Sequence, residues 1–257
     1  GYDTIHLDAA TDNNVLVINI PADDWCAEEV SNQAMALLLA SAKKVALLND
    51  YTKQGRWADA KKAQAPMAHI HGQTLGLIAC GSIGRMTGEK AQAFRMKVIA
   101  YDPYMDKVAA EKSGIALMSL PEVLQQSDFI SVHAPLMEST HHLLGEKEFA
   151  MMKPGAYVIN TARGPVIDEK AMIKALQEKR IAGAGLDVFE QEPVDPDNPL
   201  LKMENVVVTP HSASYSDFAV ALVRTIVGRE AARVLSGHWP KSVVNKGVKP
   251  KAELKAE

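Results

Sequence analysis

Seven short apolar runs, separated by helical stretches, constrain the fold of this 257-residue chain more than any other feature. Glycine, proline and asparagine punctuate the runs, and this alternation is typical of a parallel sheet with helices on both faces. We therefore expect the α/β class, with a doubly wound parallel sheet. The expected strands are residues 15–20, 74–79, 97–101, 129–133, 156–160, 182–188 and 205–209.

The helical stretches differ in length and clarity. Residues 27–48 predict one long helix, because acidic residues occupy its first turn and lysines lie near its end, as the helix dipole favours. Residues 49–73 are polar and carry Trp57, so we expect an excursion over the surface or onto a partner subunit rather than a sheet element, and assign no element there. Helical periodicity returns over 217–236, and the Lys- and Glu-rich residues 246–257 are expected to fray.

Composition argues against several classes of protein. Hydrophobic residues make up 47% of the chain and charged residues 23%, an ordinary globular balance. The net charge of -3 supplies no field for a phosphate backbone, so no direct nucleic-acid partner is expected. Cys26 and Cys80 stand in unrelated contexts, which excludes a CxxC site and favours a reducing cytoplasm. No run reaches the ~20 apolar residues that span a bilayer, so we expect a soluble protein without a membrane partner or a metal site.

A glycine turn follows the expected strand 74–79. Gly81 and Gly84 form a G-x-x-G turn that opens a helical stretch, and the next strand ends at Asp102. A helix that starts at such a turn presents free amides and its positive dipole end to a pyrophosphate, while Asp102 is placed to bind an adenosine ribose. Ala79 replaces the first glycine of G-x-G-x-x-G, so an ordinary strand-to-helix turn is the alternative. The flanking strands, helix and carboxylate favour a dinucleotide site.

Three polar side chains follow later strands, at the sheet edge where open α/β folds bind ligands. They are Arg163, Glu192 and His211. A guanidinium can hold a carboxylate through two hydrogen bonds, an imidazole can transfer a proton, and a carboxylate can stabilise the charged imidazole. Each residue alone more often has a structural role, but together, beside a nucleotide turn, they favour catalysis.

These segments resemble, in the same order, the D-isomer-specific 2-hydroxyacid dehydrogenase family over residues 1–240. Within the family the chain is similar to the branch of phosphoglycerate dehydrogenases and C-terminal-binding co-repressors. Residues 140–144 and Tyr215-Ser216 resemble the co-repressors, whereas Ser214 stands where co-repressors carry a tryptophan. The matching segments are residues 1–5, 28–30, 34–37, 74–84, 101–104, 133–136, 160–168, 185–193 and 209–211.

The resemblance implies a Rossmann NAD-binding domain over residues 23–212. Residues 1–22 and 213–245 would be remnants of a flavodoxin-like substrate domain whose N-terminal half is absent from this sequence. The implied reaction is hydride transfer between NAD(H) and a 2-oxoacid/D-2-hydroxyacid pair.

Residue by residue, the resemblance also implies roles at the site. Arg163 would bind the substrate carboxylate, and His211, oriented by Glu192, would be the general acid/base. The implied cofactor contacts are Gly81, Ser82, Ile83, Gly84, Tyr101, Asp102, Pro103, His133, Ala134, Pro135, Thr140, Thr161, Ala162, Asp187, His211 and Ala213.

Two other functions stay open. A co-repressor-like protein would sense NAD(H) with little turnover, and a partner would recognise its bound state. A methyltransferase could use the same glycine turn, but it would need neither His211 nor Arg163. In either case a homodimer is expected, because the helix over 27–48 and the segment around Trp57 carry more apolar surface than a monomer exposes.

Overall fold

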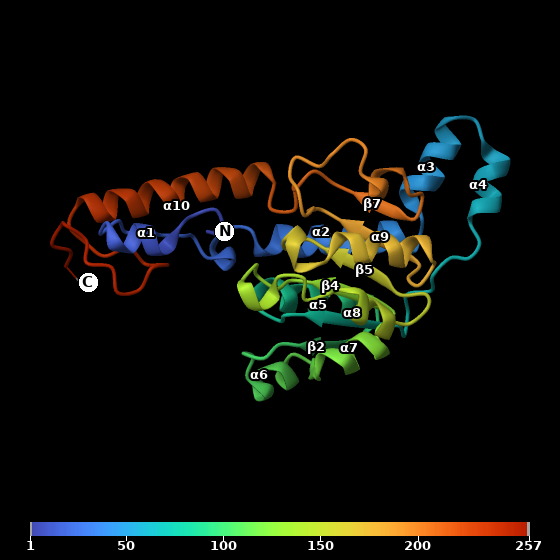
Figure 1. Cartoon of the computed structure of the whole chain (residues 1–257), viewed down its shortest axis with the longest axis horizontal. Coiled ribbons are helices and arrows are strands. Elements are labelled where there is room, and N and C mark those ends of the chain that lie inside the picture. Colours follow the sequence, from blue (N-terminus) through green and yellow to red (C-terminus); the bar gives the residue numbers. More distant parts are fainter. Residues whose placement is uncertain (1, 256–257) are drawn as a thin grey trace. The chain divides into compact units, whose positions relative to one another are not determined.

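The computed structural model describes residues 2–255 and contains a seven-stranded sheet in which all strand pairs are parallel (Figure 1). The strand order is β3-β2-β1-β4-β5-β6-β7, so the direction of winding reverses between β1 and β4. Ligands of open α/β sheets bind at the carboxyl ends of strands beside such a reversal. The strands are β1 Thr74–Ile78, β2 Lys97–Tyr101, β3 Ala116–Leu117, β4 Phe129–Val132, β5 Tyr157–Asn160, β6 Gly183–Leu186 and β7 Val206–Val208.

Six of the seven expected strands are confirmed, and one expectation is wrong. Within residues 15–20, the described backbone forms only a single antiparallel bridge, from Ile18 to Val243. The run is apolar because Val17 is buried away from the sheet, where its N–H donates to Asn245 Oδ1 at 2.9 Å. An apolar run alone does not separate a strand from a buried loop. The seventh strand is β3, whose two residues are too few to show a pattern.

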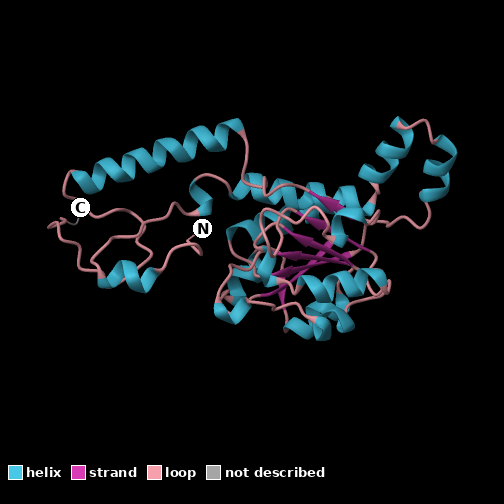
Figure 2. Ribbon diagram, turned by 45° about the horizontal axis from the view of Figure 1, so that its top comes forward, coloured by secondary structure: helices cyan, strands magenta, loops and turns pink. Residues whose placement is uncertain are grey.

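Helices cover both faces of the sheet (Figure 2). One face packs α2 and α5 around Leu75 and Leu77, and the other packs α7, α8 and α9 around Ile130. No helix within residues 2–255 is both long and apolar enough to cross a membrane. The helices are α1 Leu7–Asp12, α2 Ala27–Ala42, α3 Val45–Lys53, α4 Trp57–Ala63, α5 Ser82–Ala93, α6 Lys107–Lys112, α7 Leu120–Gln126, α8 Glu146–Met151, α9 Glu169–Gln177 and α10 Asp217–Leu235, with short 3-10 turns η1 Ala22–Asp24, η2 Glu138–Thr140, η3 Gly164–Val166 and η4 Pro199–Lys202.

The helix expected over 27–48 is interrupted. It ends at Ala42, and Lys44 then takes a left-handed conformation, with φ of 50°, before α3 begins. The Lys44 ammonium donates to the carbonyl of Ala63 at 2.9 Å, which ties the start of α3 to the end of α4. Residues 49–73, to which no element was assigned, contain part of α3 and all of α4. We call α3 and α4 together the arm.

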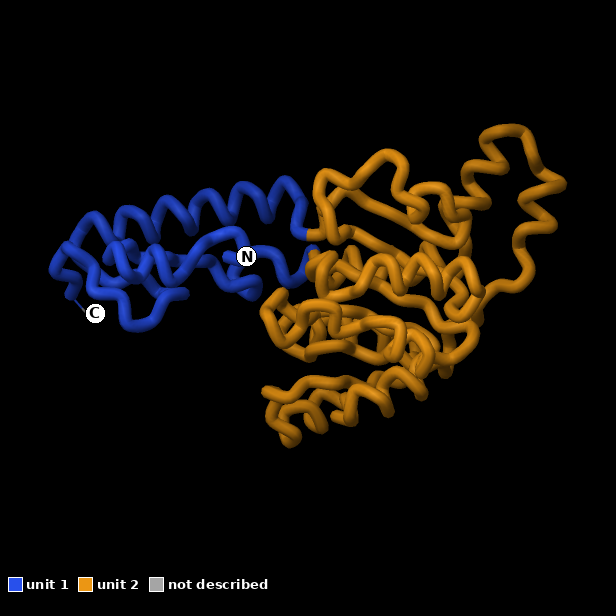
Figure 3. The backbone as a smooth tube through the Cα atoms, in the orientation of Figure 1, with its two compact units in different colours: residues 1–29, 214–257 blue, residues 30–213 orange. Residues whose placement is uncertain are grey.

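Two compact units divide the chain, residues 30–213 and residues 1–29 with 214–257 (Figure 3). Residues 30–213, unit 2 in the figure, hold the sheet, and their limits differ from the expected 23–212 because the first turn of α2 groups with unit 1. In unit 1, the tail that was expected to fray is held as far as Lys255. Its N–H donates to the Gly237 carbonyl at 2.7 Å, and its carbonyl accepts the Trp239 N–H at 3.1 Å. Residues 256–257 lie outside the described residues.

Candidate active site

The first part of the site is the turn between β1 and α5. Ala79 has a φ of 70°, the left-handed conformation that glycine adopts freely and alanine at a small cost. Gly81 caps α5, and within residues 2–255 no atom beyond its chain neighbours lies within 4 Å of the position that its Cβ would take. A Cβ at Gly84 would lie 2.6 Å from the Ala79 carbonyl oxygen, so only glycine lets the helix pack against the turn. Since the amides of Ser82 and Ile83 have no intrahelical partner, this open turn suits a phosphate.

Asp102 lies directly after β2 and is fixed by backbone amides. Its Oδ2 accepts the N–H of Cys80 at 2.7 Å, which links it to the glycine turn. Its Oδ1 accepts the N–H groups of Tyr104 and Met105 at 2.8 and 3.1 Å. A carboxylate has about four acceptor positions, so Asp102 retains capacity for a further donor such as a ribose hydroxyl.

The loop after β4 carries His133, Ala134 and Pro135. The Nε2 atom of His133 lies 2.9 Å from Ser131 Oγ, and burial lowers the pKa of His133 to about 4. The imidazole is therefore neutral near pH 7. Thr140, in η2, donates its hydroxyl to the Pro135 carbonyl at 2.6 Å and so closes this loop.

Arg163 is held by the turn that follows β5. The side chain of Asn160 accepts the Ala162 N–H and donates to the Arg163 carbonyl, both at 2.9 Å. The Arg163 guanidinium donates through Nη1 to the Ala162 carbonyl at 2.8 Å. A Cβ at Gly164 would lie 1.8 Å from the Phe189 carbonyl oxygen, so the backbone of this turn is pressed against the loop after β6. We call residues 161–164 the arginine loop.

Thr161 directly follows the end of β5 and is buried. Its hydroxyl has no hydrogen-bond partner among residues 2–255. Buried hydroxyls in folded proteins almost always have a partner. This one therefore suits a polar group that a bound molecule supplies.

Asp187 organises the loop after β7 from a fully buried position. Its carboxylate accepts the Thr209 hydroxyl at 2.5 Å and the N–H groups of Ser212 and Ala213 at 3.0 and 2.8 Å. Its carbonyl accepts the His211 N–H at 2.8 Å. These bonds hold His211 at a φ of 51°, an uncommon conformation for a residue with a Cβ and one often found at functional sites.

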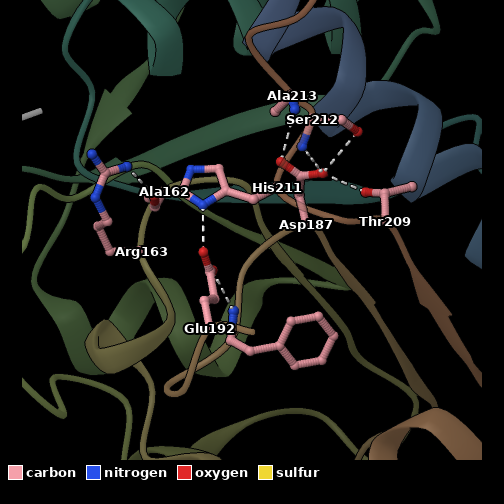
Figure 4. Close-up of polar contacts among 9 residues, drawn as sticks. Ala162, Arg163, Asp187, Glu192, Thr209, His211, Ser212 and Ala213 are labelled. Atoms are coloured by element: carbon pink, nitrogen blue, oxygen red, sulfur yellow. Dashed lines mark hydrogen bonds and ion pairs between the residues drawn. The ribbon is translucent and has the colours of Figure 1, made fainter. Parts of the chain in front are cut away.

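His211 and Glu192 form a hydrogen-bonded pair, shown in Figure 4. The Nδ1 atom of His211 lies 2.6 Å from Glu192 Oε2, and Glu192 Oε1 accepts the Phe189 N–H at 3.0 Å. The side chains are 45% and 37% exposed, so a small molecule can reach the remaining nitrogen of the ring, Nε2. An imidazole held in this way can donate or accept a proton at Nε2.

Apart from Thr140, which lies in η2 beside the loop after β4, all expected site residues lie at or after the carboxyl end of a strand. Three contributors were not expected: Asn160, Thr209 and Ser212. Their signal is local, since each is a polar residue beside an expected one. The residues group as Gly81–Gly84 after β1, Tyr101–Pro103 at the end of β2, His133–Pro135 after β4, Thr161–Arg163 after β5, Asp187 and Glu192 after β6, and His211 and Ala213 after β7.

Comparison with known proteins gives consistent results. Residues 35–213 match the family model of the D-isomer specific 2-hydroxyacid dehydrogenase, NAD binding domain. The chain is 40% identical over 252 residues to a glyoxylate reductase of Korarchaeum cryptofilum, covering 96% of this chain and 74% of that protein. It is 39% identical over 255 residues to a D-3-phosphoglycerate dehydrogenase of Methanocaldococcus jannaschii, covering 99% of this chain and 48% of that protein.

A solved structure extends the similarity to the backbone. The D-lactate dehydrogenase of Aquifex aeolicus, complexed with NAD and lactic acid, matches with a TM-score of 0.84 and 32% identity, covering 92% of this chain and 74% of that one. The family model spans more than half of the chain, and the sheet, the glycine turn and the order of the site segments agree with it. The chain therefore belongs to the D-isomer-specific 2-hydroxyacid dehydrogenase family, a family of NAD-dependent oxidoreductases, and residues 35–213 are its NAD-binding domain.

Proposed function

We propose that the protein reversibly reduces a 2-oxoacid to a D-2-hydroxyacid, with NADH as the reductant. The observation that carries this proposal is the contact of 2.6 Å between His211 and Glu192, at the carboxyl edge of an NAD-binding sheet. A binding protein needs no proton donor there. A reductase does, because the carbonyl oxygen gains a proton as the carbonyl carbon gains a hydride.

The proposed division of labour follows from the charges. Arg163 binds the carboxylate of the 2-oxoacid and orients its carbonyl toward His211. Glu192 engages Nδ1, so the transferred proton is the one on Nε2. The negative charge of Glu192 stabilises the imidazolium that donates this proton in reduction and is re-formed in oxidation. When bound, NADH supplies the hydride.

The residues expected to bind NAD carry groups that suit its pyrophosphate, its ribose hydroxyls and its nicotinamide amide. The open turn at Gly81 and the first amides of α5 would hold the pyrophosphate, and Asp102 would accept the ribose hydroxyls. The buried hydroxyl of Thr161 gains a partner if the nicotinamide amide lies beside it. His133 to Pro135 would line the adenine side, and Asp187 would lie near the nicotinamide.

We also propose a domain assignment, a cellular location and an oligomeric state. Residues 1–29 and 214–245 would belong to the substrate domain of the family, and the protein would act in the cytoplasm. It would form a homodimer through the arm and α2. In a monomer the arm would expose large apolar side chains to solvent, since Trp57 is 64% exposed and Val45 55% exposed.

A substrate panel tests the proposed activity. NADH oxidation by full-length protein is followed by absorbance with glyoxylate, hydroxypyruvate, pyruvate and 3-phosphohydroxypyruvate. We expect turnover with at least one of them. Tight NADH binding with no turnover on any 2-oxoacid would instead favour a sensor that a partner protein reads.

A further inference from the structure

A second histidine–carboxylate pair lies beside the one assigned to catalysis. Nε2 of His142 contacts Oε1 of Glu190. Glu190 is two residues from Glu192 and belongs to the same loop after β6. The ring of His141 stacks on that of His142, with 4.0 Å between their centroids. Neither His142 nor Glu190 has a role in the proposed reaction.

His142 is fastened to the segment that follows the arginine loop. Its N–H donates to the carbonyl of Pro165 at 2.8 Å, and the N–H of Leu144 donates to the carbonyl of Val166 at 3.2 Å. His142 has a φ of 51°, again a left-handed conformation on a residue with a Cβ. Such outliers persist where the surroundings fix them, often at functional sites.

The loop that carries Glu192 has no regular secondary structure, and its position depends on a few contacts. One side is pressed against the arginine loop, where a Cβ at Gly164 would meet the Phe189 carbonyl. The N–H of Glu190 donates to Glu169 Oε2 at 3.1 Å, which ties the loop to α9. The side chain of Glu190 reaches from this loop to the segment around His142.

We propose that His142 and Glu190 are positioning residues that hold Glu192 against His211. Resting on the proposed function, the inference gives this pair a part in catalysis without contact with the substrate. Both histidine–carboxylate pairs hold the loop after β6, one through Glu190 and the other through Glu192, and Phe189 of the same loop is pressed against the arginine loop. A displacement of the Glu192 carboxylate by about 1 Å weakens its interaction with the imidazolium, and such misplacements cost up to about 100-fold in rate.

The titration of His211 reports this position directly. The charged groups around its ring are Glu192, Arg163 and Asp187, and the Asp187 carboxylate is occupied by Thr209, Ser212 and Ala213 (Figure 4). Glu192 is thus the carboxylate whose distance from the ring depends on the loop that Glu190 anchors. Loosening this loop removes support from the imidazolium.

The test compares His142→Ala and Glu190→Gln with a matched control, Glu146→Gln. The control breaks an exposed pair between α8 and α9, in which Lys174 Nζ lies 2.9 Å from Glu146 Oε1. The pH at which the His211 ring titrates is measured by NMR, its signal being assigned by its loss in His211→Gln. The kcat, KM and alkaline limb of the reduction profile are measured alongside, together with NADH affinity and Tm.

We expect both variants to move the His211 titration and the alkaline limb to lower pH, in the direction of Glu192→Gln. We also expect kcat to fall about tenfold, with NADH affinity unchanged, and the control to match the wild type. His142→Gln keeps a donor for Glu190 and should recover most of kcat. The double variant should lose no more than either single variant, because the two residues act as one contact.

An unchanged His211 titration in both variants would overturn the inference, whether or not Tm falls, because a merely structural pair changes stability alone. The NMR readout needs no turnover. A wild type without 2-oxoacid reductase activity whose variants still shift the titration would contradict the proposed function and support the positioning role.

Discussion

Glu192 Oε2 lies 2.6 Å from His211 Nδ1, and the same carboxylate accepts the backbone N–H of Phe189 through its other oxygen. The carboxylate is therefore fixed at one end by its own loop and presents its charge to the imidazole at the other. This arrangement suits the proton transfer that we propose, because the imidazole is 45% exposed and its Nδ1 rather than its Nε2 faces Glu192.

Glu192→Gln tests what this carboxylate does. Glutamine keeps the size and an oxygen acceptor but removes the charge that stabilises the imidazolium. We expect a modest fall in kcat and an alkaline limb of the reduction profile at lower pH, since the proton is lost more readily. The measurement is kcat as a function of pH for both proteins. A limb that does not move would mean that Glu192 only shapes its loop.

Asp102→Ser tests cofactor choice. The 2'-phosphate of NADPH would lie close to the Asp102 carboxylate, and like charges at this separation cost about 1 to 4 kcal/mol, or roughly 5- to several-hundred-fold in kcat/KM. We expect the wild type to prefer NADH by that order and the variant to lose most of the preference. Asp106→Ser is the control, because Asp106 caps α6 and serine is also a good cap. Equal kcat/KM values for NADH and NADPH in the wild type would contradict the role of Asp102.

Because His133 is buried, the free energy of unfolding should depend on pH. Burial lowers its pKa from 6.5 to about 4, so between these values the unfolded chain binds a proton that the folded protein does not. The free energy of unfolding should therefore fall as the pH falls from 6.5 to 4, by up to about 3 kcal/mol. Urea unfolding at several pH values should show a shallower fall for His133→Gln, whereas the variant of an exposed histidine, His69→Gln, should follow the wild type. Parallel curves for His133→Gln and wild type would show that His133 contributes nothing.

Trp57→Ala tests the proposed dimer. A large exposed aromatic side chain on the arm is the kind of residue that anchors an interface, and its truncation typically costs at least about 2 kcal/mol of association, roughly 30-fold in Kd. Light scattering over a dilution series should show a dimer for the wild type and earlier dissociation for the variant. Phe94→Ala, which removes a 46% exposed side chain at the end of α5, serves as the control. A wild type with the mass of one chain at all concentrations would rule out the dimer.

Much of the fold could be predicted because buried parallel strands are nearly continuous apolar runs, as at residues 129–132 and 157–160. Two features of the fold were predicted wrongly or not at all, for opposite reasons. β3 is too short for a pattern, whereas residues 15–20 have the pattern but bury Val17 outside the sheet. The break at Lys44 lay within a continuous helical periodicity, because a left-handed lysine leaves no mark on the sequence.

Site residues could be predicted where binding a carboxylate or transferring a proton requires a particular residue type after a strand. Arg163, Glu192 and His211 were inferred in this way, and the contact between the last two is present. The supporting contacts were not predictable. Asn160 closes the arginine loop and the Asp187 carboxylate accepts from Thr209, Ser212 and Ala213 around His211, and such bonds depend on backbone geometry that no spacing encodes. The pairing of His142 with Glu190 joins residues 48 positions apart.

The central claim is that His211 donates the proton in 2-oxoacid reduction, and His211→Gln tests it most directly. The kcat for the best 2-oxoacid of the panel is measured with NADH for the wild type and the variant, and NADH affinity is measured by fluorescence titration. We expect the kcat of the variant to be lower by about 100- to 10,000-fold, with NADH affinity nearly unchanged. A variant with a kcat near that of the wild type would contradict it.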